Sequence, residues 1–257
     1  MNSKITIYAL KKFPEIQAGD DLGFIISETI KDNNIKLSTG DVICIAQKVI
    51  SKAENCIYEL KKIKPSKKAI EISSKLNKDP RKVEIILRES KSIIRVFKHE
   101  NQNEGVMICE HKLGFISANS GVDESNTGKN GLVITLPKNP DISAQNICKI
   151  ISEKFNCNIG VIITDTFGRP WRLGQLNVAI GLSKIPATID ERGNSDNSGR
   201  KLKVTEPAFA DEIAAASGLV IKKNSNTPVV IVQGLKWKEA NSKIDDIIRK
   251  VEEDMFR

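Results

Sequence analysis

The stretch Ile159-Gly160-Val161-Ile162-Ile163-Thr164-Asp165-Thr166-Phe167-Gly168-Arg169-Pro170 contains the clearest strand of the chain. Its first half, residues 159–164, is an apolar run of strand length, which is typical of a strand buried on both faces. Its second half, residues 165–170, is polar and is predicted to be a loop. A polar loop at the carboxyl end of a buried strand is a position that often carries chemistry.

Outward from this stretch, strands and helices are mixed along the chain. A second buried strand is predicted at residues 42–46, directly after a Gly40-Asp41 turn. Further strands are expected at residues 5–10, 106–110, 114–118, 132–136 and 227–232. Helices are expected at residues 21–31, 67–76, 143–155, 207–216 and 242–255, with another that starts at the Asp79-Pro80 pair.

These elements do not alternate regularly as strand–helix–strand units. An α+β fold with mixed or antiparallel sheets and flanking helices is therefore favoured over a doubly wound sheet. Residues 121–131 and 193–200 are predicted to be polar loops, the second of them a candidate lid. No repeat, low-complexity linker or clear boundary interrupts the chain, so residues 1–257 are predicted to form a single domain.

Composition excludes several classes of protein. The chain has 257 residues, of which 40% are hydrophobic and 28% are charged, which excludes a mainly disordered or collagen-like chain. The longest apolar runs are far shorter than a membrane helix, and residues 1–7 lack the apolar core of a secretory signal. The five cysteines are scattered without a C-x-x-C pair, so neither a zinc site nor a disulfide framework is expected. We therefore expect a cytoplasmic protein.

The net charge of +8 comes from a single segment of the chain. Residues 61–98 contain thirteen basic and four acidic residues, a net charge of +9, and the remainder of the chain is nearly neutral. Its basic residues are mostly lysine, and it has one aromatic residue, Phe97, so it lacks the arginine content and the stacking platform of a typical nucleic-acid surface. Two interpretations remain: a solvated helical face, or a surface that attracts small anions.

Two segments are rich in oxygen ligands. One surrounds Asp123, and the other contains Asp165 and Thr166. Carboxylate, hydroxyl and amide oxygens are the ligands that Mg²⁺ and Mn²⁺ prefer. The plainer interpretation is that both aspartates cap turns or helices. Glycines 121 and 128 are too far apart for a Walker-type phosphate loop.

A pair of lysines, Lys48 and Lys52, follows the strand at residues 42–46. If this stretch is helical, the two side chains share a face and can reach one polyphosphate; otherwise they are two exposed lysines. His99 and His111 have no partner at metal-binding spacing and are interpreted as structural or surface residues. Ser51 and Ser120 have no visible partners of a hydrolase triad, so nucleophilic hydrolysis is not favoured.

Three strings in this order resemble the coenzyme F-420-0:L-glutamate ligase family. They are A-Q-K-V-I-S-K-A-E at residues 46–54, A-N-S-G-V-D-E-S-N at residues 118–126 and I-T-D-T-F-G-R-P at residues 163–170. Residues 14–22, 210–216 and 228–235 agree with the family pattern as well. The resemblance covers residues from about 10 to 235.

This resemblance implies a GTP-dependent carbon–nitrogen ligase. Members of the family add L-glutamate to the lactyl carboxylate of the deazaflavin F-420-0 through an acyl phosphate, and they extend the product by γ-glutamyl linkage. It further implies Mn²⁺ or Mg²⁺ at two sites, K⁺, and an intertwined homodimer with a fold particular to the family. Small-molecule substrates are expected, without a nucleic-acid or membrane partner.

The resemblance also assigns roles to positions of this chain. It makes Asp123 and Asp165 the catalytic carboxylates that hold one metal ion, and it makes Thr166 a ligand of the second. It places around the nucleotide Phe13, Pro14, Glu15, Ile16, Gln47, Lys48, Lys52 and Asn126. Where relatives have a Gly-Gln pair that supplies another metal ligand, this chain has Lys222-Lys223. A protonated lysine cannot bind a cation, so either the second metal is held differently, or Lys223 lies beside the nucleotide and replaces part of that metal's charge.

Two other hypotheses remain open. The Lys222-Lys223 pair favours a related ligase that acts on a different carboxylate. The basic segment at residues 61–98 favours a binder of anions or nucleic acid without enzymatic activity.

Overall fold

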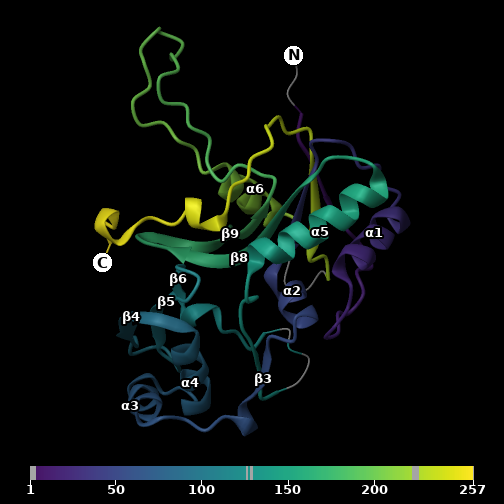
Figure 1. The fold of residues 1–257 in the computed structure, drawn as a ribbon. Coiled ribbons are helices and arrows are strands. Elements are labelled where there is room, and N and C mark those ends of the chain that lie inside the picture. Colours follow the sequence, from purple (N-terminus) through teal and green to yellow (C-terminus); the bar gives the residue numbers. More distant parts are fainter. Residues whose placement is uncertain (1–3, 126, 128–129, 222–225, 257) are drawn as a thin grey trace.

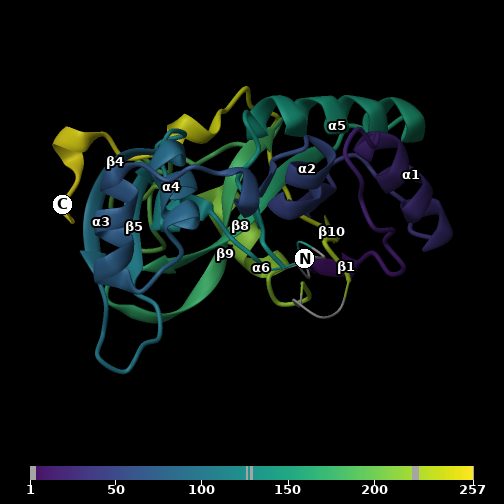
Figure 2. The same cartoon turned by 90° about the horizontal axis from the view of Figure 1, so that it is seen from below.

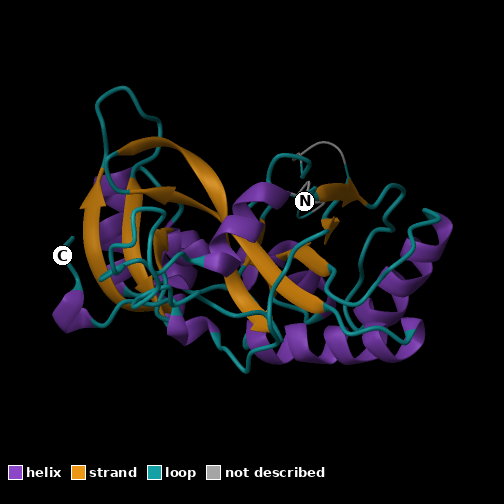
Figure 3. Cartoon of the chain, turned by 90° about the horizontal axis from the view of Figure 1, so that it is seen from above, coloured by secondary structure: helices purple, strands orange, loops and turns teal. Residues whose placement is uncertain are grey.

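The computed structural model describes residues 4–125, 127, 130–221 and 226–256. In this part of the chain the main sheet is mixed, and its strands lie side by side in the order β1 (Thr6–Ala9), β10 (Val229–Gln233), β2 (Val42–Ala46), β8 (Gly160–Arg169) and β9 (Arg172–Ser183) (Figures 1 and 3). Strands β2 and β8 are parallel, and the other neighbours are antiparallel. The predicted α+β class is confirmed.

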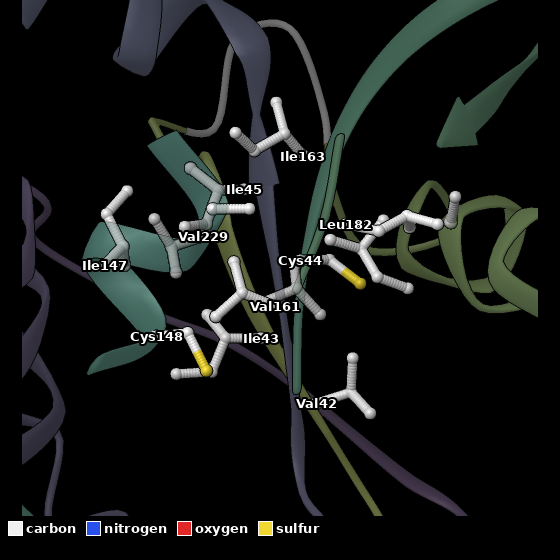
Figure 4. Packing of buried hydrophobic residues seen from close by; sticks show 14 of the residues in the cluster. Val42, Ile43, Cys44, Ile45, Ile147, Cys148, Val161, Ile163, Leu182 and Val229 are labelled. Atoms are coloured by element: carbon white, nitrogen blue, oxygen red, sulfur yellow. The ribbon is translucent and has the colours of Figure 1, made fainter. Parts of the chain in front are cut away.

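Helices cover both faces of this sheet. Helix α5 (Pro140–Phe155), with α1 (Leu22–Asp32) packed beside it, lies on one face, and α6 (Phe209–Ser217) lies on the other (Figure 1). Ile43 and Ile45 point toward α5, whereas Cys44 points to the opposite side (Figure 4) and contacts Ser217 of α6. Burial on both faces explains why every position of β2 is apolar.

Helix starts follow their capping residues. The Asn139 side chain accepts a hydrogen bond from the backbone N–H of Ile142 at 3.1 Å, and Pro140 fits the first turn, so α5 begins three residues before the predicted start. The predicted helix α3 (Lys67–Leu76) and the predicted start of α4 (Pro80–Glu89) are confirmed. No helix of the described chain is both long enough and apolar enough to cross a membrane.

A second hydrophobic cluster lies beside the main sheet. It forms between α3, α4 and an antiparallel sheet of β4 (Ser90–Phe97), β5 (Val106–His111) and β6 (Ile116–Ala118). We call residues 67–118 the small unit; its helices lie at the opposite end of the molecule from α1 (Figure 2). Short strands β3 (Ile57–Glu59) and β7 (Leu132–Ile134) pair next to it. The basic segment therefore builds most of the small unit.

One predicted loop is a strand. Residues 165–169 continue β8 and pair with β9, with Asp165 opposite Val178 and Thr166 opposite Asn177. The loop prediction for residues 165–170 is therefore wrong, because the partner strand β9 was not recognised from the sequence. That partner satisfies the backbone hydrogen-bonding groups of a polar strand, which apolar patterning alone does not indicate. The predicted loop at residues 193–200 is confirmed, and it projects away from the main sheet (Figure 1).

The predicted helix at residues 242–255 is also wrong. This part of the chain contains two short 3-10 turns, η3 (Ile244–Asp246) and η4 (Val251–Glu253). Ile244 is buried, and its N–H donates to a carboxylate oxygen of Asp141 at 3.2 Å. Phe256 instead packs on Trp171, with ring centroids 4.6 Å apart. Because the apolar side chains contact separate parts of the surface, tertiary contacts outweigh the helical periodicity.

Candidate functional site

A cavity of about 760 Å³ lies at the carboxyl end of β2, beside the middle of the longer strand β8. The two strands are parallel, with Ala46 opposite Thr164, so the residues that follow each of them meet at the same edge. The lining includes these predicted site residues: Phe13, Pro14, Glu15, Ile16, Gln47, Lys48, Lys52, Asp165 and Thr166. The structure thus brings together residues from three separate parts of the sequence.

Helix α2 (Gln47–Ala53) begins directly where β2 ends, without an intervening loop. The conditional helix prediction is confirmed, and Lys48 and Lys52 lie one turn apart on the side that lines the cavity. Gln47 is buried, and its side-chain oxygen accepts a hydrogen bond from the Ser51 hydroxyl at 2.8 Å. The strand therefore fixes the position of both lysines.

Lys48 contacts the segment that contains Asp123. Its Nζ lies 2.5 Å from Oδ2 of Asp123 and 2.5 Å from Oγ of Ser125. The Asp123 carboxylate also accepts hydrogen bonds from the backbone N–H of Ser125 at 2.9 Å and from its hydroxyl at 2.7 Å. Burial alone would raise the pKa of Asp123, but Lys48 and Ser125 outweigh burial and lower that pKa to about 2.

Asp165 has the opposite electrostatics. Burial, with a smaller contribution from the nearby Asp123 charge, raises its pKa to about 6, against the opposing effects of the Thr166 N–H and Lys48. The neighbouring Thr166 hydroxyl donates to the side-chain oxygen of Asn177 at 3.0 Å. Two carboxylates close enough to influence each other, one of them costly to ionise, form a site that favours added positive charge.

The N-terminal segment closes one side of the cavity. Glu15 Oε1 lies 2.5 Å from Lys52 Nζ, and the side chains of Phe13 and Ile16 are buried. Asn226 donates from its side-chain nitrogen to the backbone oxygen of Phe13 at 3.0 Å. Among the described residues, both cavity lysines, Lys48 and Lys52, are therefore paired with a carboxylate.

The donor groups fit a hard divalent cation. Asp123, Asp165 and Thr166 supply two carboxylates and a hydroxyl, the ligand types that Mg²⁺ and Mn²⁺ combine with water and substrate oxygens. Among the described residues, no group of three or more His, Cys, Asp or Glu side chains could hold a metal ion by itself. Lys48 supplies the positive charge beside Asp123 in this structure, so a cation at Asp123 would compete with it.

Several site residues were not predicted from the sequence. They line the cavity from β9, from the end of α6 and from the segment before β10, and they include Gln175, Leu176, Asn177, Ala215, Gly218, Leu219, Thr227 and Pro228. The apolar alternation of Leu176, Val178, Ile180 and Leu182 is the signal that could have indicated β9. The predicted residues Asn126, Lys222 and Lys223 lie outside the described residues.

Comparison with known proteins identifies the relatives of this chain. A family model described as F420-0:Gamma-glutamyl ligase matches residues 11–234. A protein of Methanocaldococcus jannaschii named coenzyme F420:L-glutamate ligase is 44% identical, over 99% of this chain and 97% of the relative. Proteins of the same name from Methanothermobacter thermautotrophicus and Halobacterium salinarum are 38% and 35% identical; they align with 98% and 97% of this chain, and with 99% and 94% of their own lengths.

Proposed function

The chain belongs to the F420-0:gamma-glutamyl ligase family, and from this membership we propose that it joins L-glutamate to coenzyme F420. In finer detail, the proposed enzyme uses GTP to add L-glutamate to the lactyl carboxylate of F-420-0 and then extends the product by γ-glutamyl linkage. One observation carries this proposal. Nine of the residues that the family resemblance assigns to the nucleotide and to metal line one cavity, although they come from distant parts of the sequence, and Asp123 contacts the cavity residue Lys48.

The cavity residues have complementary roles in this proposal. Lys48 and Lys52 bind the nucleotide phosphates as point charges, and the phosphates displace Glu15 from Lys52. Phe13 and Ile16 form an apolar wall against which the nucleotide packs. Mn²⁺ or Mg²⁺, held by Asp123, Asp165 and Thr166, would offset the charge that develops on the transferred phosphoryl group, with K⁺ as a further cofactor.

The proposed reaction has two steps. A carboxylate oxygen of the acceptor attacks the γ-phosphorus of GTP, the bond from that phosphorus to the bridging oxygen breaks, and GDP leaves. The amine of L-glutamate then attacks the carbonyl carbon of the acyl phosphate, phosphate leaves, and the new amide nitrogen loses its proton. The protein holds both substrates in line and excludes water from the acyl phosphate.

We also propose that the working protein is a cytoplasmic homodimer with a fold particular to its family. Leu173 is 99% exposed and Trp171 is 85% exposed at the tip of the β8–β9 hairpin. Large apolar side chains at the end of a projecting hairpin favour cover by a second copy of the chain. All five cysteines are free thiols, which is compatible with a reducing compartment.

The activity is tested with purified protein, F-420-0, L-glutamate, GTP and Mn²⁺. Mass spectrometry is expected to detect product with one or more added glutamates, together with release of phosphate. Asp123→Ala and Asp165→Ala are expected to abolish both while circular dichroism shows a retained fold. A wild-type protein that makes no product and releases no phosphate contradicts the proposal.

A second candidate is a related ligase for a different carboxylate, which the Lys222-Lys223 pair favours. It predicts phosphate release with another acid and none with F-420-0. A panel of carboxylate acceptors, each assayed with GTP and with ATP, separates the two candidates.

A further inference from the structure

Two lysines of the basic segment turn inward instead of facing solvent. The side chains of Lys78 and Lys82 are 3% and 9% exposed. Lys78 Nζ lies 2.6 Å from a carboxylate oxygen of Glu104, and Lys82 Nζ lies 2.5 Å from Glu124 Oε2 and 3.7 Å from Glu104 Oε2. A buried ammonium is costly unless it is paired, so these contacts hold the carboxylates firmly.

Helix α4 holds the segment at residues 119–125 at two points. Near its start Lys82 pairs with Glu124, and at its end the backbone oxygen of Glu89 accepts a hydrogen bond from the buried Ser120 hydroxyl at 3.2 Å. Seven residues separate the two points on the helix, a distance of about 10 Å. The segment is thus attached on both sides of Asp123.

The segment needs this attachment because its backbone is strained. Asn119 and Ser120 both have a φ of 52°, in the left-handed region, which asparagine tolerates but serine avoids. Conformations of this kind persist where surrounding contacts impose them. Local preference alone therefore does not determine where Asp123 and its neighbours lie.

The path from Lys82 to the Asp123 carboxylate passes through Ser125. The Asp123 backbone is fixed independently, since its N–H donates to the Ile134 oxygen at 3.0 Å and its oxygen accepts from the Ile134 N–H at 2.8 Å. The Asp123 carboxylate is held by Lys48 and by Ser125, and Ser125 donates to it from both its N–H and its hydroxyl. Glu124 lies between Asp123 and Ser125, so its ion pair with Lys82 fixes the turn that orients the carboxylate.

We propose that Lys82 is a positioning residue for the divalent cation site. It acts through Glu124 and Ser125 on the orientation of the Asp123 carboxylate. This inference rests on the proposed function in one respect, the role of Asp123 as a metal ligand. It also gives the buried part of the basic segment a role in the site.

The test measures Mn²⁺ binding directly, by the electron paramagnetic resonance signal of free Mn²⁺ in titrations with GTP present. Lys82→Met is expected to weaken Mn²⁺ binding about tenfold, the usual effect of losing an outer-shell partner. Lys78→Met is the matched control, because Lys78 is also buried and paired, but its partner is Glu104 and not Glu124. It is expected to bind Mn²⁺ like the wild type, and Lys82→Arg is expected to restore binding.

A second variant guards against misfolding. Glu124→Gln changes an exposed side chain and leaves Lys82 3.7 Å from Glu104, so it removes one ion pair without leaving the buried ammonium unpaired, and it is expected to weaken Mn²⁺ binding to the same extent. In the ligase assay the Mn²⁺ concentration for half-maximal rate should rise, while the KM for L-glutamate stays constant.

Each result bears on one of the two proposals. Lys82→Met and Glu124→Gln proteins that bind Mn²⁺ as tightly as the wild type overturn the inference, as does an equal loss in Lys78→Met. A wild type that makes no glutamylated product, but whose Mn²⁺ binding is weakened by Asp123→Ala and by Lys82→Met, overturns the proposed function and supports the inference. A wild type that binds no Mn²⁺ overturns the inference.

Discussion

Asp165 is a carboxyl group in surroundings that disfavour its charge. Burial raises its pKa to about 6 in the folded protein, from an ordinary value of 3.8. A carboxyl group whose pKa is higher in the folded than in the unfolded state makes the protein less stable as it ionises. The free energy of unfolding therefore falls by about 3 kcal/mol in total as the pH rises from about 4 to about 6. The residue is thus retained at a cost to folding, which is typical of a functional site.

We therefore expect Asp165→Asn to stabilise the protein in the absence of divalent ions. Its Tm should exceed that of the wild type by several degrees at pH 7, and the difference should largely vanish near pH 3, where Asp165 is mostly protonated in both the folded and the unfolded state. Differential scanning calorimetry in EDTA at the two pH values measures this. A Tm that falls at pH 7 would show that the carboxylate stabilises the fold.

Lys48 is the cavity lysine with most contacts to the oxygen-rich segment. Replacing it with methionine removes a phosphate-binding charge, so we expect Lys48→Met to weaken GTP binding by at least about tenfold in calorimetric titration. Lys61→Met is the matched control, because the Lys61 side chain is 77% exposed and lies in the basic segment. Equal GTP affinities of the two variants would contradict the role given to Lys48.

At the scale of single residues, the sequence predicts the charged groups of the site better than their partners. Asp165, Lys48 and Lys52 stand in recognisable strings, and all three line the cavity. Asn177 and Ser125 were not predicted as partners, because their roles depend on distances between segments that no local pattern encodes.

At the scale of elements, burial decides what could be predicted. Strand β2 is buried at four of its five positions, so its apolar pattern predicts its bounds correctly. The outer half of β8 and most of β9 lie beyond the sheet core and pair with each other, so their polar positions conceal a long hairpin. The helix prediction for residues 242–255 is wrong for the reverse reason. Its apolar residues have helical spacing, but they contact separate parts of the surface and do not form one helix face.

The C-terminal end of α5 offers a test of local conformation. Asn156, which follows the helix, has a φ of 49°, which glycine adopts without strain and alanine does not. We expect Asn156→Gly to leave the free energy of unfolding unchanged or raise it by up to about 1 kcal/mol, and Asn156→Ala to lower it by about 1 kcal/mol. Urea unfolding of the two variants measures the difference, and equal stabilities would contradict this reasoning.

At the scale of the whole molecule, the proposed homodimer gives a direct prediction. Leu173 is 99% exposed, so Leu173→Asp costs the monomer little, but it would place a charge inside an interface formed by the hairpin tips. Sedimentation velocity is expected to show a dimer for the wild type and a monomer for Leu173→Asp. Val204→Asp, on the exposed loop before α6, tests whether the interface extends there. An unchanged dimer in both variants would exclude these surfaces.

The order of strands in the main sheet has a consequence for folding during synthesis on the ribosome. Strand β10, which comes late in the sequence, lies between β1 and β2, which come early in it. Until about residue 233 has emerged from the exit tunnel, β1 has no neighbour in that sheet and β2 has an open edge. A nascent chain therefore carries an apolar, unpaired strand through most of its synthesis, a state prone to aggregation. Chains arrested before β10 should be bound by chaperones and digested by proteases, and the finished protein should fold slowly for its size.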